Sequence, residues 1–169
     1  MQQKKGVMPI ILLLIGCVLL TIWVWKQETA SIAQLEWTTF DLDRILAEEK
    51  PVLLNISSDN CPYCVMMEPD LAQIHKQYGE QAVVADINLD RCPESSWQLP
   101  VRATPTQILF YADGSPYLPS EAVQQEMTFL YYVTEADSTA EEVHVLTVHE
   151  GMLTAAQMKV ILQDLGVSI

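Results

Sequence analysis

The most continuous apolar segment of the chain lies near its start. Residues 7–25 contain no charged side chain, and Lys4 and Lys5 precede them. At about 1.5 Å of rise per residue, a helix over this segment would extend for about 28 Å, which matches the hydrocarbon thickness of a bilayer. Trp23 and Trp25 stand at the far end, where aromatic rings favour the membrane interface. The pattern predicts a transmembrane anchor at 7–25 with a cytoplasmic basic flank at 1–6.

Two other interpretations of this leader remain open. Ser31-Ile32-Ala33 offers small residues for a signal-peptide cleavage site, although the apolar region is longer than the usual 7–15 residues. Leu14-Ile15-Gly16-Cys17 is similar to a lipoprotein attachment box, but the residues after Cys17 remain apolar instead of opening into a polar tether. All three interpretations export the rest of the chain from the cytoplasm.

Beyond a polar linker at 26–34, the pattern changes to the alternating runs of a folded domain at 35–169. Short apolar runs predict buried strands at 51–57, 82–89, 106–111 and 143–148, and β-branched and aromatic residues give 128–134 strand character. Helical spacing and capping residues predict helices from 42 to before Pro51, from 61 to about 78 with a kink at Pro69, at 94–99, at 120–127, and from Thr154 to Gly166.

This order of elements predicts an α/β fold. Strands that alternate with helices and then form a hairpin favour a mixed sheet of four to five strands, covered by helices on both faces. The segment 115–142 interrupts the last hairpin and is predicted to be an insertion, whose strand pairs with 143–148. The N-terminal transmembrane helix stands outside this domain.

Composition narrows the range of functions. Half of the 169 residues are apolar, which is enough for a packed core. The formal net charge is -13, and all 22 acidic residues follow the apolar leader. Nucleic-acid binding needs a basic footprint, so the charge excludes a nucleic-acid partner for the domain.

The candidate chemistry lies in a C-x-x-C motif formed by Cys61 and Cys64. Such a pair serves redox exchange or metal binding, and its position after a buried strand and at the start of a helix favours redox exchange. Unpaired N–H groups at a helix N-terminus stabilise a thiolate, so Cys61 is predicted to be the exposed nucleophile. Cys64, one turn later, is predicted to be shielded and to resolve a mixed disulfide. Pro62 suits the first helical turn, because its missing N–H would be unpaired there anyway.

Three segments in the same order resemble the thioredoxin family. Residues 51–69, with the motif Cys-Pro-Tyr-Cys and a proline five residues after it, resemble the family's active site. Residues 101–110 resemble its cis-proline segment, and residues 149–158 resemble its closing turn and final helix. The resemblance covers about 35–167 apart from the insertion, and it implies the thioredoxin fold.

The resemblance also implies which residues form the site. It places a cis Thr104–Pro105 bond beside the redox-active disulfide Cys61–Cys64. Backbone groups of Thr104 would then be free to pair with an extended substrate strand, and Pro62 and Tyr63 would shape the same groove. No cofactor and no metal is implied.

The sequence departs from the family pattern around the motif. Asn55 occupies the position at which thioredoxins usually carry a buried acid that assists proton transfer at the second cysteine, a role that an amide cannot perform. Ser57 and Asn60 replace aromatic residues and leave a more polar approach. His149 lies close to the implied groove and is a candidate modulator, because imidazole titrates near neutral pH. His75, Met66 and Met67 are interpreted as packing residues, and Cys92 as a partly buried bystander.

These features predict an exported thiol–disulfide oxidoreductase that reduces disulfides of extracytoplasmic proteins. Its partners would be protein thiols and disulfides and a membrane thiol-reductant transporter fed by cytoplasmic thioredoxin, as the resemblance suggests. The same residues would serve a disulfide oxidase or isomerase, because direction depends on the reduction potential. The alternative from another class is a redox-inert binding or assembly module that uses the insertion as its contact surface.

Overall fold

The computed structural model describes residues 11–23, 36–37, 40–93, 99–135 and 142–169. The chain divides into two compact units, Met1–Gln34 and Leu35–Ile169. In the first unit, residues 11–23 form a helix whose apolar side chains are largely exposed. The predicted anchor at 7–25 extends beyond these described residues at both ends. Among the residues that are described, no helix combines the length and the apolar character needed to span a bilayer.

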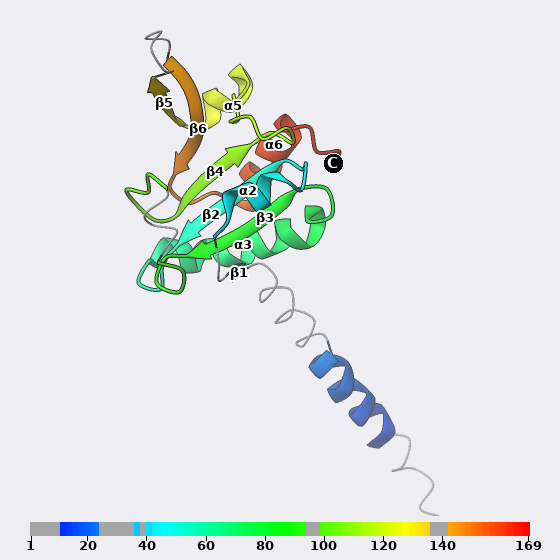
Figure 1. Ribbon diagram of the computed structural model, residues 1–169. Coiled ribbons are helices and arrows are strands. Elements are labelled where there is room, and N and C mark those ends of the chain that lie inside the picture. Colours follow the sequence, from blue (N-terminus) through cyan, green and yellow to red (C-terminus); the bar gives the residue numbers. More distant parts are fainter. Residues whose placement is uncertain (1–10, 24–35, 38–39, 94–98, 136–141) are drawn as a thin grey trace, which may run out of the picture. The chain divides into compact units, whose positions relative to one another are not determined.

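The second unit is built on a six-stranded mixed sheet with the strand order β1-β3-β2-β4-β6-β5 (Figure 1). Its strands are β1 (Glu36–Trp37), β2 (Val52–Ser57), β3 (Val83–Asn88), β4 (Thr106–Phe110), β5 (Leu130–Glu135) and β6 (Glu142–Glu150). The strands β1, β3 and β2 are parallel, and β4, β6 and β5 follow in antiparallel pairs. The prediction of four to five strands was one short, because the two residues of β1 are too few for a periodic pattern.

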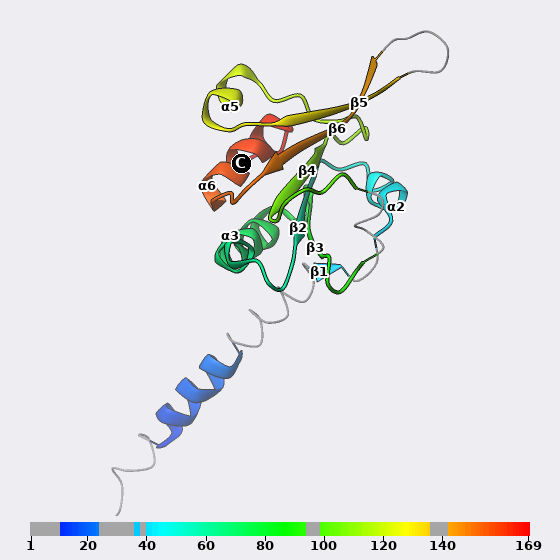
Figure 2. The same cartoon turned by 90° about the vertical axis from the view of Figure 1, so that its left-hand side faces the viewer.

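Helices cover both faces of the sheet. They are α2 (Leu42–Leu46), α3 (Pro62–Tyr78), α5 (Glu121–Glu126) and α6 (Ala155–Asp164). Helices α3 and α6 lie on one face and α2 lies on the other (Figure 2). Most of the helix predicted at 94–99 lies outside the described residues.

Local sequence signals explain where these helices begin. The side chain of Asp41 accepts the Arg44 N–H at 3.1 Å and caps α2, as its position predicts. Thr154 and Gln157 form a complete capping box at the start of α6, which confirms their spacing as a start signal. These contacts satisfy backbone donors that the first helical turns would otherwise leave unpaired.

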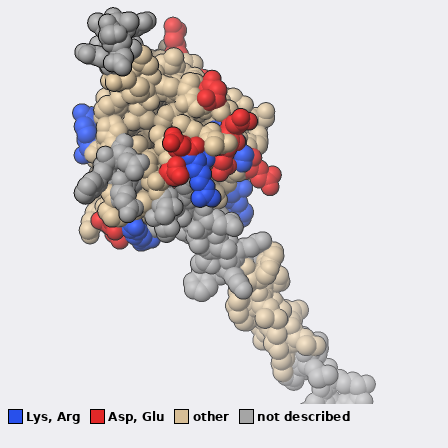
Figure 3. Space-filling model, in the orientation of Figure 1, with Lys and Arg blue, Asp and Glu red and all other residues tan. Residues whose placement is uncertain are grey.

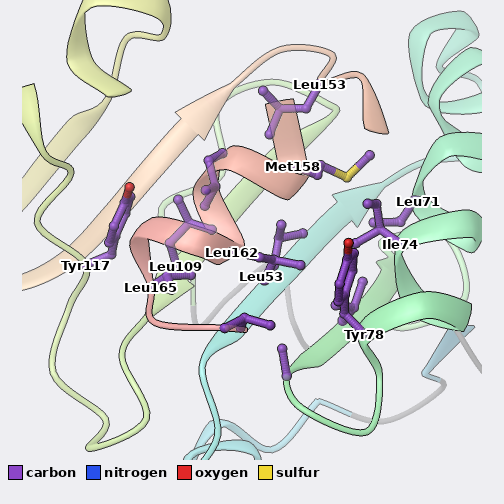
Figure 4. Close-up of a cluster of buried hydrophobic side chains, with 14 of the residues drawn as sticks. Leu53, Leu71, Ile74, Tyr78, Leu109, Tyr117, Leu153, Met158, Leu162 and Leu165 are labelled. Atoms are coloured by element: carbon purple, nitrogen blue, oxygen red, sulfur yellow. The ribbon is translucent and has the colours of Figure 1, made fainter. Parts of the chain in front are cut away.

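Successive side chains of β2 point to opposite faces of the sheet, and the core is therefore divided into two clusters. Leu53 points to the face of α3 and α6, where it joins a cluster with Leu109, Met158 and Leu162 (Figure 4). The neighbouring side chains of β2 point to the opposite face and pack with Ile45 of α2. All six residues of β2 are buried, as expected for a strand covered on both faces. The strand that leads into the Cys-x-x-Cys motif is therefore held rigidly from both sides.

The insertion at 115–142 contributes α5 and the edge strand β5. Strand β5 pairs antiparallel with β6, which confirms the predicted pairing of the two segments. Ser120 occupies the N-cap position of α5, but its side chain makes no capping hydrogen bond. The insertion leaves the ladder between β4 and β6 intact from Thr106↔Glu150 to Leu109↔Thr147. It therefore extends the sheet without displacing the strands that carry the site.

Charged side chains of both signs share the face of the molecule that Figure 3 shows. Lysine and arginine atoms lie among aspartate and glutamate atoms there, with uncharged surface between them. Such a mixed surface provides no continuous basic footprint on this face, in line with the charge of the sequence.

Candidate active site

Cys61 and Cys64 lie where β2 ends and α3 begins, and they form a disulfide with a Cα–Cα distance of 5.2 Å. Cys61 is the N-cap residue of α3, and its Sγ accepts the N–H of Cys64 at 3.1 Å. Pro62 is the first residue of the helix, as predicted. The helix terminus therefore directs a backbone donor at the sulfur of Cys61. This contact would stabilise negative charge on that sulfur after reduction.

The prediction that Cys61 is exposed is wrong for this oxidised state, whereas Cys64 is shielded as predicted. Cys61 is 7% exposed and Cys64 is 8% exposed. The reason is a tertiary contact, because the carbonyl oxygen of Thr104 lies 3.3 Å from Cys61 Sγ and covers it. Tyr63, between the two cysteines, is 62% exposed. The motif thus presents Tyr63 to solvent and keeps both sulfur atoms beneath the surface.

The cis-proline segment stands beside the disulfide, as the family resemblance implies. The Thr104–Pro105 peptide bond is cis. The carbonyl oxygen of Pro105 accepts the N–H of Gly151 at 2.9 Å, which ties the segment to the turn after β6. Gly151 has a φ of +124°, a conformation that a residue with a side chain rarely adopts. Thr104, at the start of this segment, lies against Cys61.

The loop before Cys61 is fixed by the loop that follows β3. Asp59 donates its backbone N–H to Asp90 at 2.7 Å and accepts the side-chain amide of Asn88 at 2.8 Å. Arg91 also contacts Asp59, at 3.0 Å. The backbone of Cys61 itself donates to the carbonyl of Ser58 at 3.2 Å. These contacts fix the loop that leads into the N-cap residue.

A chain of buried polar side chains runs across the sheet below the motif. Gln107 donates from Nε2 to Asn55 Oδ1 at 2.9 Å, and Asn55 donates from Nδ2 to Asp86 at 2.5 Å. Ser57 donates to the other carboxylate oxygen of Asp86 at 2.6 Å. Asn55, Ser57 and Gln107 are buried. The predicted modulator Asn55 is therefore not isolated, because it bonds to an acid on the neighbouring strand.

His149 faces the insertion. Its Nδ1 lies 2.9 Å from the carbonyl oxygen of Thr128, and its ring lies 5.8 Å from that of Phe129. Burial lowers the pKa of His149 below its ordinary value of 6.5, against weaker opposing effects of the Thr128 carbonyl and Glu150. Glu150 follows it in the chain, and Gly151 then contacts the cis-proline segment. His149 thus connects the insertion to the strand end that supports the site.

The packing predictions for His75 and Met67 are confirmed, and those for Cys92 and Met66 are corrected. Nδ1 of His75 lies 2.7 Å from the carbonyl oxygen of Val84. Cys92 is fully buried in the second core cluster, not partly buried as predicted. Met67 is buried and its sulfur accepts the N–H of Leu153 at 3.5 Å. Met66 is 63% exposed, because it lies on the outer side of α3. Within the described ranges, acidic, histidine and cysteine side chains form no cluster of three that would hold a metal ion.

Sequence reasoning did not identify Asp86, Gln107 or the pair formed by Arg102 and Glu150. The guanidinium of Arg102 binds both carboxylate oxygens of Glu150 at 2.9 Å. One signal for Asp86 was present, since it is the only charged residue within the strand Val83–Asn88. A charge on an otherwise buried strand requires polar partners, and it is therefore a marker of a polar network.

Comparisons with known proteins agree with this geometry. The family model for thioredoxin matches residues 31–135. A thioredoxin of Alicyclobacillus acidocaldarius is 29% identical over 101 residues, which are 56% of this chain and 95% of the relative. A thioredoxin of Mycolicibacterium smegmatis is 34% identical over 93 residues, which are 54% of this chain and 80% of the relative.

Solved structures are similar as well. The thioredoxin Mala s 13 of Malassezia sympodialis is 14% identical and aligns with a TM-score of 0.49. The alignment covers 78% of this chain and 90% of the solved chain.

Proposed function

The chain belongs to the thioredoxin family, and from that premise we propose that it reduces disulfide bonds of proteins outside the cytoplasm. It is a thiol–disulfide oxidoreductase with a Cys-x-x-Cys pair. The direction of exchange and the location outside the cytoplasm are the parts that we propose. The observation that supports exchange at this site is the position of Cys61, whose sulfur accepts a helix N-terminal N–H and lies against the cis-proline segment.

The reaction begins from the reduced pair. The thiolate of Cys61 attacks one sulfur of a substrate disulfide, so that a mixed disulfide forms and one substrate thiolate leaves and takes a proton from water. Cys64 then loses its proton and attacks Cys61 Sγ. The bond between Cys61 and Cys64 forms, the mixed disulfide breaks, and the second substrate thiolate leaves. Two electrons have then passed from the enzyme to the substrate, and the oxidised state has the Cys61–Cys64 disulfide described above.

The substrate is held as an extended strand. Tyr63 and Pro62 are exposed beside the disulfide, and Thr104 offers backbone groups next to them. A peptide that pairs with Thr104 would bring its own sulfur to Cys61, which is β-strand addition to a preformed edge. Because backbone groups make these bonds, the groove would accept many sequences. This agrees with a general reductant of protein disulfides.

Export and recharging complete the proposal. The uncharged segment 7–25 and the preceding Lys4 and Lys5 support an N-terminal anchor with the domain on the extracytoplasmic side. A reductant there needs electrons from across the membrane, so its partner would be a membrane thiol-reductant transporter. A fusion of alkaline phosphatase, which is active only outside the cytoplasm, to the C-terminus tests the location. An inactive but stably expressed fusion would refute export.

The opposite direction is the second candidate. The dipeptide Pro62-Tyr63 lies between the cysteines and is fixed by the helix terminus, and this part of the motif helps to set the potential in the family. An oxidase or isomerase would use the same atoms in reverse, with Cys61–Cys64 as the starting disulfide. The reduction potential distinguishes the two candidates.

The decisive experiment measures that potential by equilibrating the full chain with redox buffers, in a Cys17→Ser background. A value near about -270 mV supports the reductant, and a value near about -120 mV supports the oxidase or isomerase. Cys61→Ser must remove both the couple and all exchange activity, whereas Cys64→Ser must trap the mixed disulfide. If the unmodified pair shows no reversible couple, the chain is a redox-inert binding module instead.

A further inference from the structure

Asp86 lies in the middle of the sheet. Two polar side chains of the neighbouring strand β2 donate hydrogen bonds to its carboxylate. Asn55 donates to one carboxylate oxygen at 2.5 Å, and Ser57 donates to the other at 2.6 Å. Asn55 and Asp86 are direct partners in the register between β2 and β3. Both donors lie on the strand that leads into Cys61. Asp86 is therefore connected by hydrogen bonds to the strand end that carries the motif.

The network lies on the face of the sheet that α3 covers. Gln107 joins the network through Asn55, and its Nε2 also lies 3.7 Å from the sulfur of Met67 on α3. Met67 and Cys64 are three residues apart, and both are buried, so they share one face of the helix. The buried side chain of Cys64 thus faces the same polar layer, one helical turn closer to the start of α3.

The direction of the two elements brings Cys64 and Ser57 to the same end of the sheet face that α3 covers. Helix α3 runs back across β2 after the short loop at 58–61, so its N-terminal turn covers the C-terminal end of the strand. One helical turn advances about 5.4 Å and two strand residues advance about 6.6 Å. Met67 contacts Gln107, the register partner of Asn55, so one turn back along the helix and two residues along the strand bring Cys64 and Ser57 to the same end of this face.

The resolving step needs a proton acceptor at this place. Cys64 must be a thiolate to attack Cys61, but a cysteine thiol ordinarily has a pKa of about 8.5. An amide at position 55 accepts no proton. A serine hydroxyl accepts a proton and at the same time donates its own, so Ser57 is able to relay a proton from Cys64 to Asp86. The hydrogen bond from Ser57 to Asp86 already has the direction that such a relay requires.

We propose that Asp86, acting through Ser57, accepts the proton of Cys64 when Cys64 resolves the mixed disulfide. The inference rests on the proposed exchange at Cys61 and Cys64. In the step, Cys64 transfers its proton to Ser57 and Ser57 transfers its own to Asp86. The S–S bond between Cys64 and Cys61 then forms, and the bond from Cys61 to the substrate breaks. The substrate thiolate is protonated by water, and Asp86 later releases its proton to solvent. Asp86 thus acts on Cys64 only through Ser57, and we call it a positioning residue for that reason.

Other titratable groups lie on the elements next to Asp86. Helix α3 carries His75, whose Nδ1 lies 2.7 Å from the carbonyl oxygen of Val84, and the loops at the ends of β2 and β3 carry three charged residues. Those loop residues are Asp59, Asp90 and Arg91. The hydroxyl of Ser57 donates to Asp86, so a substitution at Asp86 separates its role from theirs.

The test resolves the two chemical steps in time. Reduced Cys17→Ser protein is mixed with one equivalent of 5,5′-dithiobis(2-nitrobenzoate), which releases one thiolate when Cys61 attacks and a second when Cys64 resolves. Asp86→Asn is compared with Glu68→Gln, which removes one exposed carboxylate from α3. We expect Asp86→Asn to slow only the second release, by at least about tenfold at pH 6, and to approach the unsubstituted rate at pH 9, where hydroxide replaces the acceptor. Glu68→Gln should change neither phase.

Two further variants test the relay itself. Ser57→Ala should reproduce the loss seen in Asp86→Asn. The exchanged pair Asn55→Asp/Asp86→Asn keeps one acid and one amide on the same two strands, and it should recover most of the rate at pH 6. The inference is overturned if Asp86→Asn leaves the second phase unchanged, slows both phases equally, or is equally slow at pH 6 and pH 9. If the unsubstituted protein shows no second release at any pH, the proposed exchange fails as well.

Discussion

Arg102 and Glu150 face each other through two parallel hydrogen bonds of 2.9 Å, so that each carboxylate oxygen receives one N–H. Arg102 lies two residues before Thr104, and Glu150 is the register partner of Thr106 at the end of β6. The pair therefore spans the cis-proline segment from one side to the other. Hydrogen bonding by Arg102 lowers the pKa of Glu150, and the same contact raises the pKa of Arg102.

Arg102→Gln should weaken the exchange with protein substrates. Arg102 is exposed and Glu150 is half-buried at the surface, and surface ion pairs contribute little to stability, so the unfolding midpoint should hardly change. The cis-proline segment would lose a contact that orients Thr104, and a small misplacement reduces rate. We expect kcat/KM for a protein disulfide to fall by about threefold or more, while the reaction of Cys61 with a small disulfide is unchanged. Arg44→Gln, which changes an exposed residue of α2, is the matched control; an equal effect there would contradict the prediction.

Tyr117→Phe should destabilise the fold through a lost buried hydrogen bond. Tyr117 is fully buried and donates to Asp164 at 2.6 Å. Burial, followed by the hydrogen bond to Asp164, raises the pKa of Tyr117 far above its ordinary value. Asp164 keeps the backbone N–H of Ser120 in the variant, which limits the loss to about 1–2 kcal/mol in urea unfolding. Tyr111→Phe loses only an exposed bond to Leu118, and it should cost less.

The stability of the protein should fall as the pH drops through about 6.5. Burial lowers the pKa of His149 in the folded state, so the unfolded chain binds the proton more readily. Its contribution is complete above the ordinary value of 6.5 and is lost as the pH falls below it. The lowered pKa of Glu150 acts in a separate, more acidic range, below about 4.5.

Two measurements check the histidine prediction. An NMR titration of the ring should give a midpoint below 6.5, and a midpoint at or above that value would contradict the prediction. Urea unfolding of His149→Gln between pH 7.5 and pH 5 should show a flatter dependence than the unsubstituted chain.

Leu162→Ala should show how strongly α6 is anchored to the sheet. Leu162 is fully buried in the cluster between α6, α3 and the sheet. Truncation of a buried leucine leaves a cavity and costs about 2–5 kcal/mol. Leu118, which is 61% exposed, provides the control, and Leu118→Ala should change the free energy of unfolding by less than about 0.5 kcal/mol. Equal losses in the two variants would contradict the assignment of this core.

Local signals predicted most of the fold and the position of the cysteine pair. The buried strand before Cys61 and the capping box of α6 follow from residues close together in the chain, because strand burial and helix capping depend on neighbouring residues. The strand pairing of the insertion was predictable for the same reason, since β5 and β6 are joined by a short acidic connection. The cis Thr104–Pro105 bond was implied by the family resemblance.

The features that sequence reasoning missed arise from contacts between distant segments. Cys61 is covered by Thr104, and Asp86 receives its hydrogen bonds from the neighbouring strand. The exposure of Met66 depends on which side of α3 meets the sheet, and that is set by tertiary packing. Asp86 is recognisable in the sequence as an unusual charge on a buried strand, but the sequence does not indicate which residue it contacts. Register between strands supplied that partner, because Asn55 and Asp86 are aligned in the ladder.

The uninterrupted ladder between β4 and β6 has a kinetic consequence. A hairpin of two adjacent strands usually closes through a loop of 2–5 residues, whereas about thirty residues separate Phe110 from Glu142 here. Closing the longer connection costs about 2 kcal/mol more in chain entropy. This cost arises before any hydrogen bond forms between β4 and β6. Strand β6 should therefore join the sheet late in folding, after α5 and β5 have shortened the effective span. A nascent chain would meanwhile have β4 unprotected on that side, as a site where misassembly begins.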